Sequence, residues 1–142
     1  MLVQLTIGSA LLVVSIILSA IGFWIVESCL HRLGYWLRGV HQGARMLVFL
    51  SMASLWVFLQ LTLGVWIWAV CFWRLGIFDA LEPAVYFALV SFTTLGFGDI
   101  LLPVEWRLLG GMTAVNGLLN VGLVTAILVE FLRQARLSPE AD

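Results

Sequence analysis

The sequence has little charge and no lysine. Of its 142 residues only 11% are charged, and all seven basic residues are arginine. A soluble domain carries about 25% charged residues. This composition, with 63% hydrophobic residues, therefore indicates a single-domain membrane protein. The net charge of −1 gives no indication of nucleic-acid binding.

Cysteine is also scarce, and no catalytic centre is visible. The two cysteines, Cys29 and Cys71, fall at opposite ends of the membrane in the topology argued below, so no bond is expected between them within one chain. Both are interpreted as small buried apolar residues. Cys29 and His31 provide too few ligands for a metal site. Without a nucleophile–base pair or a phosphate loop, we expect neither an enzyme nor an organic cofactor.

Three long segments contain no charged residue: 1–26, 46–73 and 108–129. Each is long enough for a spanning helix, which needs about 20 residues. The first lacks the basic start of a signal peptide and is interpreted as a retained transmembrane helix. A shorter apolar stretch, Pro83 to Phe92, follows the second segment and is too short to span. We predict that it is a re-entrant helix surrounded by protein.

The polar segments predict the orientation in the membrane. Arg32, Arg38 and Arg45 lie between the first two apolar segments. The positive-inside rule places this loop in the cytoplasm and the N-terminus outside. Two further spans then place the C-terminal tail, residues 134–142, in the cytoplasm.

Aromatic and capping residues mark the predicted outer side. Trp66, Trp68 and Trp73 cluster at one end of the second segment and are expected to form an aromatic belt at the membrane interface. Asp79 and Glu82 have the spacing of a capping box, followed by a proline in the first helical turn. This pattern is typical of the first turn of a helix, and the short helix is expected over about residues 83–93.

The stretch Thr93-Thr94-Leu95-Gly96-Phe97-Gly98-Asp99 follows the short helix. A dehydrated cation needs oxygens in place of its water, and consecutive carbonyls supply them only if they point the same way. Glycine adopts the left-handed dihedrals this requires at no steric cost. Thr94 adds a hydroxyl oxygen at one end, and Asp99 places a carboxylate at the outer mouth that concentrates cations. A Gly-rich turn between two helices is the alternative.

This stretch resembles the pore signature of the potassium channel family, whose loop is written TVGYG. Leu95 replaces the usual Val and Phe97 the usual Tyr, and family members with Gly-Phe-Gly are known. The resemblance implies a selectivity filter in which K⁺ binds at Thr94, Leu95, Gly96 and Phe97, with Gly98 completing the loop. In many members the Tyr hydrogen-bonds to aromatic residues of the pore helix, which Phe97 cannot do, so packing must hold the ribbon there.

The fold class that follows is an all-α membrane protein with three transmembrane helices, a re-entrant pore helix and a selectivity-filter loop. The predicted segments are an N-terminal helix (1–28), a cytoplasmic loop (29–45), a pore domain (46–133) and a cytoplasmic tail (134–142). The pore domain divides into an outer helix (46–73), the pore helix (83–93), the filter (94–99) and an inner helix (105–132).

One filter loop cannot encircle an ion, and the family's filter uses four. The resemblance therefore implies a homotetramer in the lipid bilayer of the cell membrane, conducting potassium ions passively. A regulatory partner is left open. Two alternatives remain: an auxiliary subunit that does not conduct alone, and a weakly selective cation channel. The intact Gly-Phe-Gly-Asp sequence argues against both.

Polar residues and glycines interrupt the predicted inner helix. Thr113, Asn116 and Asn120 share one helical face by their spacing. They line a water-filled cavity or form hydrogen bonds between helices. Gly117 lies closest to the place where the family has a gating hinge. Close helix packing is the alternative for Gly117, since small residues also permit it.

Overall fold

The computed structural model describes residues 1–36 and 42–137, and all regular structure in these ranges is helical. The elements are α1 (Leu2–Trp36), α2 (Gln42–Arg74), α3 (Leu81–Phe92), the 3₁₀ helix η1 (Val104–Trp106) and α4 (Arg107–Leu137). Three segments are long and apolar enough to cross a membrane: Leu2–Cys29, Leu50–Arg74 and Val104–Val129. The shorter α3 is apolar but cannot span. The predicted all-α membrane fold is confirmed.

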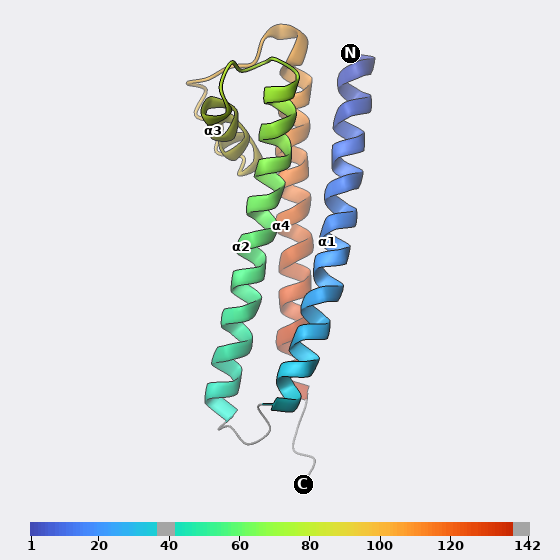
Figure 1. Cartoon of the computed structure of the whole chain (residues 1–142), viewed down its shortest axis with the longest axis vertical. Coiled ribbons are helices and arrows are strands. Elements are labelled where there is room, and N and C mark those ends of the chain that lie inside the picture. The colour runs from blue at the N-terminus through green and yellow to red at the C-terminus, as the bar shows by residue number, and fades with distance from the viewer. Residues whose placement is uncertain (37–41, 138–142) are drawn as a thin grey trace.

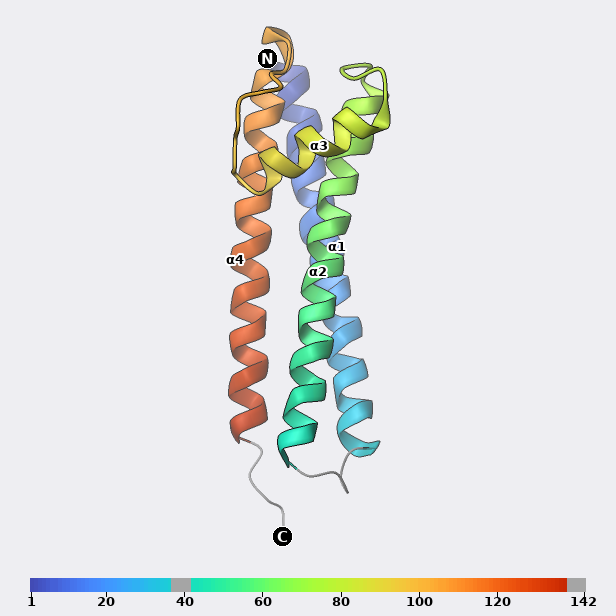
Figure 2. The ribbon, with the colours of Figure 1, turned by 90° about the vertical axis from the view of Figure 1, so that its left-hand side faces the viewer.

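The three long helices form a slender bundle in which α1 and α4 run in one direction and α2 in the other (Figure 1). Helices α1 and α3 lie on opposite sides of the α2–α4 pair. From the end of α2 the chain descends through α3 toward α4, then climbs back along α4 to its start (Figure 2). The N-terminus of α1 lies at this same end of the bundle, which we call the loop end.

Two predicted polar segments are helical over part of their length. Helix α1 continues to Trp36 and α2 begins at Gln42, so the predicted loop at 29–45 is wrong for residues 29–36 and 42–45. Arginine is a good helix former, so a charge such as that of Arg32 does not end a helix. Helix α4 likewise continues to Leu137, into the predicted tail. Residues 37–41 of the loop and 138–142 of the tail lie outside the described residues.

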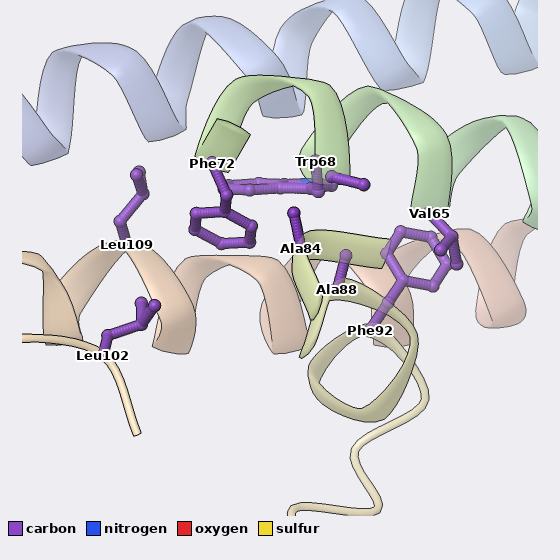
Figure 3. Packing of buried hydrophobic residues seen from close by; sticks show 9 residues of the cluster. Val65, Trp68, Phe72, Ala84, Ala88, Phe92, Leu102 and Leu109 are labelled. Atoms are coloured by element: carbon purple, nitrogen blue, oxygen red, sulfur yellow. The ribbon is translucent and has the colours of Figure 1, made fainter. Parts of the chain in front are cut away.

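The core lies where α3 packs against α2 (Figure 3). It consists of Val65, Trp68, Ala69 and Phe72 of α2, Ala84, Ala88 and Phe92 of α3, and Leu102 and Leu109. Ala84 and Ala88 are one turn apart and fully buried, so the backbone of α3 can lie close to α2. The ring of Phe72 meets that of Phe87 edge-on at 5.3 Å between centroids. Protein thus covers the non-spanning helix on this side, as the membrane requires.

Several sequence-based expectations around this core are wrong. Trp66 and Trp73 are exposed, but Trp68 is fully buried against α3, because helical periodicity turns only one of the three inward. The N-cap of α3 is Ala80 and makes no side-chain cap. The helix thus begins at Leu81, and the predicted capping box does not form.

The cysteines are free, but Cys29 is exposed rather than buried as predicted. Cys71 is half-buried. Cys29 lies near the C-terminal end of α1 and Cys71 near the C-terminal end of α2, which are opposite ends of the bundle (Figure 1).

Candidate functional site

The backbone after α3 alternates in handedness. Thr94, Gly96 and Gly98 have φ angles of 61°, 58° and 75°. Left-handed dihedrals at every second residue allow successive carbonyl groups to point to one side of the chain. The left-handed conformation predicted for Gly96 and Gly98 is confirmed. That of Thr94 was not predicted, and for a β-branched residue it is rare and costs about 1–3 kcal/mol.

The end of α3 anchors this ribbon through its last carbonyl groups. The N–H of Thr94 donates to the Ser91 carbonyl at 2.9 Å. The N–H groups of Leu95 and Gly96 both donate to the Val90 carbonyl, at 3.0 and 3.3 Å. Within the described chain no hydrogen bond is made to the carbonyl groups of residues 94–98. The ribbon's N–H groups are therefore tied to α3 while its carbonyl oxygens stay free for another ligand.

Asp99 is held beside the ribbon by two hydrogen bonds. The Tyr86 hydroxyl donates to Oδ2 at 2.5 Å, and the N–H of Ile100 donates to Oδ1 at 3.0 Å. The hydrogen bond from Tyr86 is the main reason that the pKa of Asp99 lies below its ordinary value. Asp99 therefore carries a negative charge at neutral pH. The sequence did not identify Tyr86 as the partner of Asp99.

The side chain of Phe97, unlike that of Asp99, is not bonded to α3. Its side chain is 66% exposed and that of Leu95 is 60% exposed. An open hollow, lined among others by Tyr86, Val90 and Gly96, lies between α3 and the ribbon. The predicted packing around Phe97 is therefore not supplied within one chain. The apolar side chains of Leu95 and Phe97 are instead exposed on its surface.

Two glycines hold the last residue of α3. A Cβ atom on Gly64 of α2 would lie 2.6 Å from Cζ of the Phe92 ring. A Cβ atom on Gly117 of α4 would lie 1.7 Å from the Phe92 carbonyl oxygen. Phe92 thus sits between α2 and α4 with its ring on one glycine and its backbone on the other. For Gly117 this contact is the close packing that the sequence left as one of two alternatives, and α4 runs through it as a helix.

The polar face of α4 is buried between helices. Asn116 donates from Nδ2 to Oγ of Ser15 at 2.8 Å. Asn120 donates from Nδ2 to the side chain of Asn116 at 2.8 Å and to its backbone carbonyl at 2.9 Å. Thr113, fully buried, bonds to the Leu109 carbonyl of its own helix. Asn116 thus makes an interhelical hydrogen bond, whereas Thr113 bonds within α4. All three residues are buried within the single chain, which does not support the cavity alternative.

Ser19 links this face to α2 as well as to α1. Its hydroxyl shares one proton between Oδ1 of Asn120, at 3.0 Å, and the carbonyl of Ser15, at 2.8 Å. It also accepts from Nε2 of Gln60 at 2.5 Å. Three bonds of this cluster therefore cross between helices: Asn116 to Ser15, Ser19 to Asn120 and Gln60 to Ser19. At an average of about 0.6 kcal/mol and at most about 1.7 kcal/mol each, they contribute roughly 2 kcal/mol and at most about 5 kcal/mol. The sequence alone did not identify Ser15, Ser19 and Gln60 as partners of the two asparagines, because isolated serine and glutamine residues form no recognisable motif.

An apolar face of α4 remains uncovered. Gly111, Val115, Leu118 and Gly122 are exposed in the single chain. Their spacing places them on the side of the helix opposite Asn116 and Asn120. This face, rather than the polar one, is free to meet other molecules.

Protein side chains offer no metal centre in the part of the chain described, since no three His, Cys, Asp or Glu residues gather there. A cation would instead meet the backbone oxygens of residues 94–98 and the carboxylate of Asp99.

A family model described as an ion channel matches residues 46–134, more than half of the chain. The chain belongs to this ion channel family. The match contains most of α2, all of α3 and the ribbon, and most of α4, and it leaves α1 outside. No curated protein and no solved structure gives a significant match. The resemblance seen in the sequence is thus confirmed at the level of an ion channel pore domain.

Proposed function

We propose that the protein is a potassium-selective channel that conducts K⁺ passively through a homotetrameric pore in the cell membrane. The observation that carries the proposal is the ribbon at residues 94–98, with alternating handedness and carbonyl oxygens that accept no hydrogen bond. Such oxygens can replace the hydration shell of K⁺. The family match supports the channel part of the proposal.

The geometry of one ribbon supports the proposed tetramer. Its carbonyls present oxygens from a single direction, whereas a dehydrated ion needs them on all sides, and potassium channels combine four loops. Leu95 and Phe97 are exposed in one chain, and three further copies would cover their side chains and close the pore around a fourfold axis. The exposed apolar face of α4 would then turn toward the pore.

Within this pore K⁺ would be held by the oxygens of Thr94, Leu95, Gly96 and Phe97, with Gly98 completing the ribbon. The negative end of the α3 dipole lies directly before Thr94 and favours a cation there. The charge of Asp99, kept by its low pKa, would raise the local K⁺ concentration at the mouth. Apart from the filter, the wall of the pore would be apolar, because the exposed face of α4 contains Val115 and Leu118.

The orientation in the membrane rests on charge. Arg32 and two further arginines follow the first span, so this side is proposed to be cytoplasmic. The loop end, with the N-terminus of α1, would then face outside (Figure 1). The C-terminus would be cytoplasmic, and no catalytic reaction is assigned to the chain.

The test is ion flux from liposomes that contain only the purified protein, with K⁺ and Na⁺ measured in parallel and Gly96→Ala as the inactive control. Efflux of K⁺ far above that of Na⁺ is the expected result. Equal efflux of both ions would favour the weakly selective cation channel. A tetramer that releases neither ion would favour the auxiliary subunit.

A further inference from the structure

Helix α1 lies outside the matched pore domain, yet the face that it turns toward the other helices has residues suited to helix packing in a membrane. Its buried residues are small or polar, among them Gln4, Gly8, Ser15 and Ser19, in a segment with a mean hydropathy of 2.5. In lipid, apolar side chains do not drive helices together, so small residues and hydrogen bonds must do so. Gln4 caps the start of α4, since its Oε1 accepts from the Leu109 N–H at 3.2 Å. These contacts hold the first half of α1, from Gln4 to Ser19, to α4.

The bonds of α1 also connect α2 to α4. Gln60 of α2 donates to Ser19, and Ser19 bonds to Asn120 of α4. Asn120 bonds to Asn116, which in turn donates to Ser15. The link between Gln60 and the two asparagines thus passes through a hydroxyl of α1. Removing this hydroxyl would break the hydrogen-bonded path from Gln60 of α2 to Asn120 of α4.

This path of hydrogen bonds from α2 to α4 lies one helical turn from the two glycines that contact Phe92. Gln60 precedes Gly64 by four residues, about 6 Å along the helix, and Asn116 is next to Gly117. Gly64 and Gly117 are the two glycines that hold Phe92 between α2 and α4. The hydrogen bonds through α1 therefore hold α2 and α4 at a fixed distance from each other near Phe92. This distance in turn determines the position of Phe92.

Phe92 in turn lies two residues before Thr94, whose φ of 61° is strained. Such a conformation persists only where the surroundings enforce it. A wider gap between α2 and α4 would loosen Phe92 and allow Thr94 to relax, which turns its carbonyl.

We propose that Ser15 and Ser19 are positioning residues of the ion path, through which α1 fixes the conformation of Thr94 and so the discrimination between K⁺ and Na⁺. The inference rests on the proposed function.

The test compares Ser19→Ala with Ser28→Ala. Both serines lie on α1, and both donate to the carbonyl four residues earlier. Ser28, however, is exposed, and within the described residues it makes no hydrogen bond to another helix. Purified tetramers of each variant are placed in planar bilayers, and the K⁺/Na⁺ permeability ratio is taken from the reversal potential with K⁺ on one side and Na⁺ on the other. Ser19→Ala should lower the ratio at least about fivefold, the factor that corresponds to the low end of the strain at Thr94. Ser28→Ala should leave the ratio unchanged.

Two further variants separate positioning from folding. Ser19→Thr keeps the hydroxyl and should restore the wild-type ratio. Ser15→Ala removes one bond and should lower the ratio by less, so it carries the test if Ser19→Ala yields no tetramer. Ser19→Ala or Ser15→Ala tetramers with the selectivity of Ser28→Ala would overturn the inference and leave the proposed function intact. A wild-type protein that conducts no K⁺ would overturn both.

Discussion

Three glycine-to-alanine substitutions should change the stability of the protein to different extents, because the atoms around each glycine differ. In a helix, alanine is favoured over glycine by about 1 kcal/mol. At Gly117 the new methyl would lie 1.7 Å from the Phe92 carbonyl oxygen and 2.6 Å from its carbon. Since these are backbone atoms, α4 and α3 must move apart by more than 1 Å, and overpacking of this kind costs about 1–3 kcal/mol or more. We therefore expect Gly117→Ala to destabilise the protein despite the gain in helix propensity.

Gly64 and Gly122 provide the comparison. At Gly64 the methyl would meet the far end of the Phe92 ring, which can turn, so the cost should be smaller. At Gly122 no atom of the chain lies within 4 Å, and the substitution should be neutral or stabilising. The assay is the thermal unfolding midpoint of the detergent-purified tetramer, with K⁺ flux per tetramer beside it. Gly117→Ala protein as stable and as active as Gly122→Ala would refute the contact between α4 and the end of α3.

Three other outcomes follow from the loop end. Gly96→Ala should abolish K⁺ flux while the protein stays in the membrane, because a side chain at φ 58° costs roughly 1 kcal/mol or more and turns the carbonyls; normal selective flux would remove Gly96 from the ion path. The carboxylate of Asp99 has a lowered pKa, so its contribution to flux is present above that pKa and lost as external pH falls through it. Tyr86→Phe should move this loss to higher pH, because the hydrogen bond from Tyr86 is the main cause of the lowered pKa, and unchanged titration of the current would refute the role of the hydroxyl. In a cysteine-free background, Arg32→Cys should react with an impermeant thiol reagent only from the cytoplasm and Leu101→Cys only from outside, and reaction of both from one side would contradict three spans.

Local signals in the sequence were sufficient for the elements and for the ribbon. Apolar runs of 20 residues or more predicted the three spans, and the shortness of α3 predicted that it does not span. The spacing of Gly96 and Gly98 predicted left-handed dihedrals because that property belongs to glycine itself. The ends of the helices were less predictable, since Arg32 and its polar neighbours are compatible with a helix that leaves the membrane.

Contacts between distant segments could not be predicted in the same way. The polar face at Asn116 and Asn120 was visible, but its partners lie on α1, about a hundred residues earlier in the chain. Nothing in the periodicity of α4 says which helix covers it. The strained Thr94 was missed for a related reason, because the conformation of a β-branched residue there depends on the packing around it and not on its own preference.

The most direct measurement of the central claim is an experimental structure of the purified protein in a bilayer mimic, with K⁺ replaced by Tl⁺ so that bound ions are seen by their scattering. Four copies of the chain should surround one axis, with ions on that axis between the carbonyl oxygens of residues 94–97. A tetramer without ions at these oxygens, or an assembly in which the four ribbons do not face a common axis, would contradict the account.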